Sequence, residues 1–139
     1  MKTVHRLTAA ILAAIIMLFS LASCGDKYIS SYSALMLVRN QAGESCEARF
    51  GRLDGQLVFK LNMKSRSESD IRYTASLEEG SLSVYYDIFD SKESLFEISA
   101  GEEISSSGGY VESGRTVYII IEAEDGARGS VSISIGDED

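Results

Sequence analysis

The side chains best suited to chemistry in this chain are carboxylates, which gather in two short stretches. Asp87, Asp90 and Glu93 form the first group, and the second spans residues 122–125. Calcium takes roughly six to eight oxygen ligands, so either group could supply part of a calcium site. Neither group has the spacing of an EF-hand loop, and solvated carboxylates at turns are the simpler interpretation.

Three aromatic residues form a second candidate site, a ligand-binding strip. Tyr85 and Phe89 alternate with the apolar positions of their segment, and Tyr118 does the same in another. An aromatic strip on the outer face of a sheet can stack sugar rings, but the same pattern arises where both faces of a strand are buried. The chain has no Trp, which weakens the sugar interpretation. Burial is preferred, then a protein-facing patch, then a glycan site.

Histidine is restricted to the N-terminal segment, where His5 is the only one in the chain. Residues 24–139 therefore have no imidazole for a catalytic triad, a His-ligated zinc or general base catalysis near neutral pH. A glycosidase needs only two carboxylates, but their spacing here gives no sign of a cleft. We expect a protein that is not an enzyme.

The N-terminal segment has the layout of a secretory signal. Lys2 and Arg6 supply a positive region, and a nearly unbroken apolar stretch follows at residues 9–21. A membrane-spanning helix needs about 20 apolar residues, and this stretch gives way to polar residues at 25–27 too early. Residues 1–23 are therefore predicted to be a helical signal peptide that is removed.

The residues Leu21-Ala22-Ser23-Cys24 resemble the lipobox of bacterial lipoproteins. This resemblance implies cleavage before Cys24 and attachment of a diacylglycerol to its sulfur. Palmitate-type acyl chains would then hold the protein at a cell membrane, facing outward from the cytoplasm. Each buried methylene contributes about 0.8 kcal/mol, so two or three chains anchor a protein durably. Residues 24–33 are short and serine-rich, and we expect them to form the lipidated tether.

Net charge limits the partners that this chain can bind, and the number of cysteines limits its thiol chemistry. The net charge of −8 for the whole chain becomes −10 for residues 24–139, because the signal contains Lys2 and Arg6. Such an acidic domain argues against nucleic acid as a partner. Cys46 is the only other cysteine, so no intrachain disulfide forms once Cys24 carries lipid. The flanking glutamates favour a raised pKa for Cys46, and we expect an unreactive, buried or half-buried thiol.

Alternation of apolar and polar residues dominates the chain after residue 45. The segments that show it are 46–53, 55–65, 70–80, 81–90, 94–99, 115–124 and 130–135. Asp54-Gly55 and Asp125-Gly126 are predicted to be turns, and Glu79-Gly80 is predicted to end a strand. Residues 101–114 look like a loop, with Ile104 and Tyr110 as possible strand points, whereas residues 33–41 could be a strand or a short helix, with a strand favoured.

This pattern predicts an all-β fold, a small antiparallel β-sandwich of about seven to nine strands. The sandwich is expected to cover residues 34–139, after the signal segment and the tether. Its strands are short and end in turn residues, and no sustained helical period follows the signal.

From Gly80 to its end, the chain resembles the pre-peptidase C-terminal type of β-sandwich and related small modules of bacterial envelope proteins. The shared features are Gly-Ser-Leu-Ser-Val at 80–84, Gly114 before the strand that contains Tyr118, and Gly-Ser-Val-Ser-Ile at 129–133. The resemblance implies a non-catalytic accessory or binding module, sometimes with calcium.

The expected function is binding of a protein partner in the cell envelope, by a domain that is anchored to the membrane. The alternative is a module that binds glycan, either cell-wall or external polysaccharide. Sugar binding predicts an exposed platform made by Tyr85, Phe89 or Tyr118, whereas a protein partner needs none.

Overall fold

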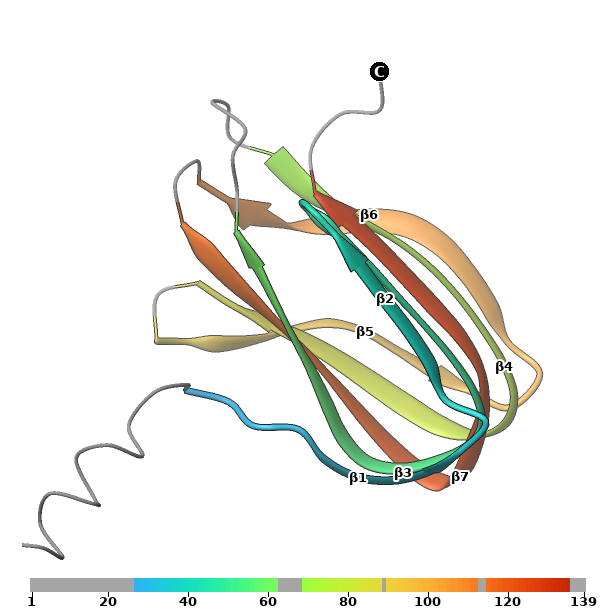
Figure 1. Ribbon diagram of the computed structural model, residues 1–139. Helices are drawn as coiled ribbons and strands as arrows, with labels where there is room; N and C mark the ends of the chain where they lie inside the picture. Colours follow the sequence, from blue (N-terminus) through green and yellow to red (C-terminus); the bar gives the residue numbers. More distant parts are fainter. Residues whose placement is uncertain (1–26, 63–68, 89, 113–114, 136–139) are drawn as a thin grey trace, which may run out of the picture.

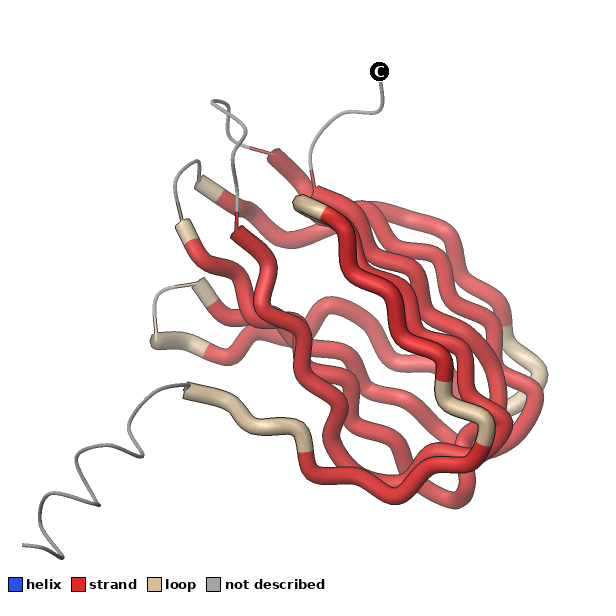
Figure 2. Tube along the Cα trace, in the orientation of Figure 1, coloured by secondary structure: helices blue, strands red, loops and turns tan. Residues whose placement is uncertain are grey.

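The computed structural model describes residues 27–62, 69–88, 90–112 and 115–135, and every regular element in these ranges is a β-strand (Figure 1, Figure 2). The strands are β1 (Ser31–Leu35), β2 (Val38–Ala42), β3 (Ser45–Asn62), β4 (Ser69–Asp87), β5 (Lys92–Ser99), β6 (Glu103–Val111) and β7 (Thr116–Ile135). All strand pairs are antiparallel, so the expected all-β antiparallel architecture is confirmed. Within the described ranges, no helix has the length and apolar character needed to cross a membrane.

The sandwich is one sheet folded over on itself, because β3, β4 and β7 each run through both layers (Figure 1). Layer A contains β2, the first half of β3, the second half of β7, the first half of β4, and β6. Layer B contains β1, the second half of β3, the first half of β7, the second half of β4, and β5. The short strands thus form the edges of both layers.

The fold-over occurs at the dipeptides that the sequence predicts as turns or strand ends. Asp54-Gly55, Glu79-Gly80 and Asp125-Gly126 lie inside β3, β4 and β7, where the ladders show register shifts. These three sequence predictions are wrong, because each strand resumes pairing with the same neighbour after the irregularity. Gly55, Gly80 and Gly126 have φ of 110°, 80° and 64°, a conformation that glycine adopts without steric cost. We call this line of bends the crease.

The core lies between the two layers and follows the predicted alternation. Its largest fully buried side chains are Leu53, Leu57, Phe59, Leu61, Ile71, Leu77, Leu82, Val84, Ile119, Ile120, Ile121 and Ile133, of which all but Ile120 belong to the core cluster.

Cys46 is also buried in the core, and burial raises the pKa of its thiol to about 12. The thiol is therefore protonated near neutral pH, and burial, rather than the flanking glutamates, is the main cause.

Two weakly patterned segments also form strands. Residues 33–41 contribute to β1 and β2, which are separated by a turn at Met36 and Leu37, so the favoured strand assignment is confirmed but interrupted. Residues 103–111 form β6 rather than a loop, because they pair with β4 from Ser69 to Ser76. Residues rich in Ser and Gly do not have a typical strand composition, so the local sequence does not predict this strand. It forms because it pairs with β4, which lies about 30 residues earlier in the chain.

Substitution of a crease glycine should destabilise the fold strongly. In Gly80→Ala the new Cβ would lie 2.6 Å from the Glu124 carbonyl oxygen and 2.7 Å from the Ala127 Cα, so the backbone would have to shift. We expect the free energy of unfolding in urea to fall by about 3 kcal/mol or more. Gly101→Ala is the matched control, since φ is 85° there but no atom lies within 4 Å; it should cost about 1–2 kcal/mol. Equal losses of unfolding free energy in the two variants would contradict the requirement for glycine at the crease.

Candidate functional site

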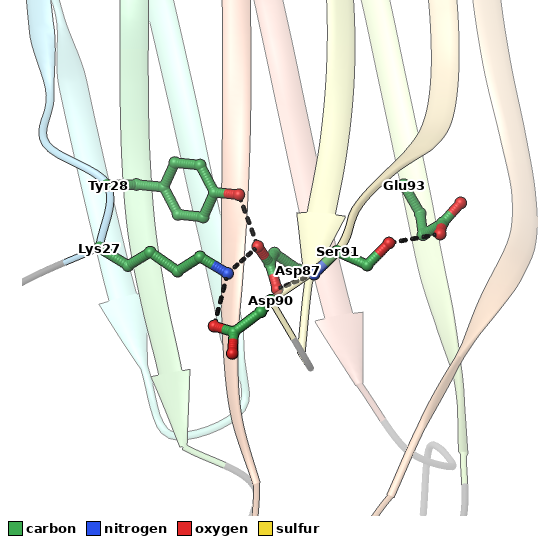
Figure 3. Close-up of polar contacts among 6 residues, drawn as sticks. All are labelled: Lys27, Tyr28, Asp87, Asp90, Ser91 and Glu93. Atoms are coloured by element: carbon green, nitrogen blue, oxygen red, sulfur yellow. Dashed lines mark hydrogen bonds and ion pairs between the residues drawn. The ribbon is translucent and has the colours of Figure 1, made fainter.

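The first described residues are bound to the outer face of layer B. Lys27 donates hydrogen bonds to Asp87 Oδ2 at 2.7 Å and to Asp90 Oδ1 at 2.9 Å, and the Tyr28 hydroxyl donates to Asp87 Oδ2 at 2.5 Å (Figure 3). The Tyr28 ring packs edge-on against Tyr118 of β7, with ring centroids 5.4 Å apart. We call Lys27, Tyr28, Asp87 and Asp90 the N-terminal clamp, because together they tie the start of the domain to the end of β4.

Asp87 is the central group of the clamp. It is 1% exposed and is the one buried charged residue in the described part of the chain. Burial alone would raise its pKa, but the bonds from Lys27, Tyr28 and the Ser91 backbone N–H outweigh burial, so its pKa is lowered. The pKa of Lys27 is raised, chiefly by its hydrogen bonds to Asp87 and Asp90. At neutral pH the clamp therefore joins an ammonium to two carboxylates.

The expected calcium ligands lie close to one another, but Lys27 already neutralises two of them. Its ammonium lies between Asp87 and Asp90, while Glu93 accepts a hydrogen bond from the Ser91 hydroxyl at 2.8 Å (Figure 3). No group of three or more His, Cys, Asp or Glu side chains in the described residues is arranged to hold a metal ion. Calcium binding at Asp87, Asp90 and Glu93 stays a prediction that would require Lys27 to move.

The predicted aromatic strip lies on the outer face of layer B and is partly covered. Tyr118 is half-buried beneath Tyr28, and the Lys60 ammonium lies 6.0 Å from the centre of its ring. Tyr85 is also half-buried, with the Lys92 ammonium 4.3 Å from its ring centre. Phe89 lies outside the described residues. Tyr85 and Tyr118 are therefore only partly exposed, and ligand binding at this strip stays a prediction.

The outer face of layer A is open and carries hydroxyl groups. Ser132 and Ser134 of β7 alternate with the buried Val131 and Ile133, and Thr74 lies between Ser132 and Ser105 in the cross-strand register. These side chains surround a shallow hollow of about 470 Å³. We call this surface the serine face; its residues are Arg72, Thr74, Ser105, Ser107, Ser132 and Ser134.

Tyr110 stands at the end of β6, beside the serine face. Its side chain is 47% exposed, whereas the next residue, Val111, is fully buried, so alternation directs Tyr110 outward. Sequence reasoning missed this surface because residues 101–114 look like a loop. The alternating serines of residues 130–135 were a visible signal, but only the pairing of β4 with β6 and β7 shows that hydroxyls from three strands share one face.

The structure describes most of the predicted tether but not the predicted lipid site. Cys24 lies outside the described residues, so its modification stays a prediction. Residues 31–33, assigned to the tether, belong instead to β1, and the Val58 N–H donates to the Ser30 hydroxyl at 2.9 Å. Residues 27–33 are therefore part of the domain, ahead of the expected boundary at residue 34, because the clamp and β3 fix this segment.

Comparison with known proteins shows only distant likenesses. No protein family and no curated protein matches the sequence. A family 29 carbohydrate-binding module complexed with mannohexaose has a TM-score of 0.43 and 14% identity, covering 76% of this chain and 78% of that one. The Drosophila melanogaster CENP-C cupin domain has a TM-score of 0.33 and 14% identity, covering 80% and 84%. Likenesses this weak carry no inference about ligand or activity.

Removal of the Asp87 charge should weaken the domain far more than removal of the Asp90 charge. Asp87→Asn leaves Lys27 and Tyr28 without their buried anionic partner, and we expect the free energy of unfolding at pH 7 to fall by about 1–3 kcal/mol. Asp90 is an exposed partner of the same ammonium, so Asp90→Asn should change it by less than about 0.5 kcal/mol. Similar losses in the two variants would contradict the central role of Asp87.

The effect of Asp87→Asn should also depend on pH. Because the folded pKa of Asp87 is lowered, its charge contributes stability that is complete above the unfolded pKa of about 4 and is lost as pH falls through the folded pKa. The difference in unfolding free energy between the native protein and Asp87→Asn should therefore shrink in acid. Urea unfolding at neutral pH and at about pH 3 measures it; a difference that grows in acid would refute the assignment.

Proposed function

We propose that this protein is a lipid-anchored, non-catalytic module of a bacterial cell envelope that binds glycan through the serine face. The observation that carries the proposal is the contrast between the two outer faces. Layer B is partly covered by the N-terminal clamp, whereas layer A presents hydroxyl groups from three paired strands around an open hollow. Hydroxyl side chains both donate and accept hydrogen bonds, as sugar hydroxyls do, and strands hold them at fixed spacing.

Two further residues support a glycan. Tyr110 offers an exposed ring at the end of β6, and an aromatic ring can pack against the apolar face of a sugar. Arg72 lies in the hollow and provides several N–H donors in a fixed geometry. The flatness of the face favours an extended chain over a small molecule enclosed in a cavity.

Asp87 is buried and bound by Lys27 and Tyr28, which makes this carboxylate a structural group and not a general acid. A glycosidase needs one carboxyl that stays protonated near neutral pH and a second that is ionised. Burial could have raised the pKa of Asp87 for such a role, but Lys27, Tyr28 and Ser91 lower it instead. The charge of Asp87 thus serves to hold the N-terminal segment.

The second candidate is a protein partner in the envelope, which the sequence alone places first. Its support is β6, a strand of nine residues that pairs with β4 along one side. No other strand of the described residues pairs with β6, so a partner could add a strand to its other side.

Tyr110→Ala should weaken glycan binding. Affinity electrophoresis against cell-wall and external polysaccharides would identify a ligand, and calorimetry should then show a loss of roughly three- to tenfold, because one stacking contact is removed. Tyr32→Ala is the matched control, a similarly exposed tyrosine on β1, and should bind as the native protein does. If no polysaccharide binds and cross-linking in intact cells enriches one envelope protein, the second candidate replaces the first.

Cys24→Ala should release the protein from the membrane. The lipid anchor requires the Cys24 sulfur, so this variant is expected to lose both lipid labelling and membrane retention. Fractionation after a high-salt wash measures retention without peripheral charge contacts. A variant that still sediments with membranes after the wash would mean that the lipobox interpretation is wrong.

A further inference from the structure

Exposed apolar side chains are concentrated at one edge of the sandwich. Six large apolar side chains are exposed in the described residues, and five of them fall between residues 29 and 38. The five are Ile29, Tyr32, Leu35, Met36 and Val38, and Met36 is 86% exposed. A cluster of this kind marks a surface that is covered in the working molecule.

The same stretch differs from the rest of the chain in charge. Residues 27–43 contain Lys27 and Arg39 and no Asp or Glu, although the chain has 21 acidic residues. On the neighbouring strand β3, Arg49 and Arg52 are also exposed, and each pairs with a carboxylate of the same strand, Glu47 and Asp54. Residues 27–43 are therefore apolar and bring no carboxylate of their own against anionic headgroups, on an otherwise acidic domain.

The edge also lies next to the expected lipid. Lys27 follows Cys24 by three residues, and three extended residues span at most about 10 Å. The clamp fixes Lys27 to the domain, so no more than these three residues separate the expected lipid from it. From there β1 and β2 run as the outer strands of layers B and A and follow the bend of β3 (Figure 1).

A groove extends this edge onto the crease. It has a volume of about 670 Å³ and is lined by Leu35, Met36 and Val38 together with Arg49, Arg128 and Glu78, which pairs with Arg128 at 3.1 Å. Apolar side chains and guanidinium groups thus meet at the corner where β1 turns into β2. Lipid headgroups and the first methylenes below them offer the matching chemistry, phosphate beside hydrocarbon.

We propose that residues 27–43 form a membrane-contact edge, on which the domain lies against the bilayer that holds the Cys24 lipid. The inference rests on the proposed anchor and adds an orientation to it. Leu35, Met36 and Val38 enter the headgroup region, and the acidic bulk of the domain points away. Because the edges of both layers face the bilayer, the layers stand upright and the serine face stays open to the side.

Site-directed fluorescence on the full lipidated protein tests this orientation. Cys24 is acylated and Cys46 is buried, so a bimane label would react with a cysteine introduced by Met36→Cys or, as the matched control on β6, by Ser105→Cys. The protein is reconstituted into vesicles of phosphatidylethanolamine and phosphatidylglycerol that contain doxyl-labelled lipid. We expect quenching at position 36 to be at least about threefold stronger than at position 105, because nitroxide quenching requires near contact.

The outcomes separate the edge from the anchor. Equal quenching at the two positions, in protein whose N-terminal peptide carries the acyl mass, would overturn the edge and leave the anchor standing. Absence of the acyl mass would overturn both. A label at position 36 that is shielded from aqueous iodide in cell membranes but not quenched by doxyl lipid would also overturn the inference, and would indicate a protein on this edge instead.

Discussion

The left-handed backbone at the crease is the constraint on which the rest of the structure depends. Three neighbouring strands bend at the same level, so one sheet covers its own apolar face without a second sheet. The Gly126 N–H donates to Asp54 Oδ1 at 2.9 Å, and Arg52 lies 3.7 Å from the other oxygen of this carboxylate, so β3 and β7 are joined where both bend. Without these bends, the alternating residues of β3, β4 and β7 would leave one whole face of a long sheet in water.

The two outer faces of the folded sheet differ in composition and in how far they are covered. In layer B, Tyr118 and Tyr85 lie on the outside, Ile120 of β7 is fully buried opposite Tyr85, and the clamp covers part of this face. In layer A, the corresponding positions are serine and threonine, which need no cover. The N-terminal segment therefore contributes to stability as well as to attachment, since it shields apolar surface and satisfies Asp87.

The two sides of the sandwich are also closed differently. On the side of β2, Arg39 donates to the Val58 carbonyl at 2.9 Å and Gln41 donates to the Lys60 carbonyl at 2.5 Å, so side chains of layer A occupy backbone acceptors of layer B. Such contacts protect an edge from pairing with another strand. An apolar edge protected in this way suits a lipid surface better than strand addition, whereas β6 pairs with β4 alone among the described strands.

The sequence by itself determined which side chains are buried, because alternation with a period of two encodes one inner face wherever a strand forms. It also determined the acidic character of the domain and the expectation of a lipid on Cys24. Only the tertiary structure decided that Asp54-Gly55, Glu79-Gly80 and Asp125-Gly126 bend continuous strands, because a dipeptide that permits positive φ serves a turn and a bend equally well. The burial of Asp87 likewise depends on Lys27, a partner 60 residues away, and no local pattern encodes such a contact.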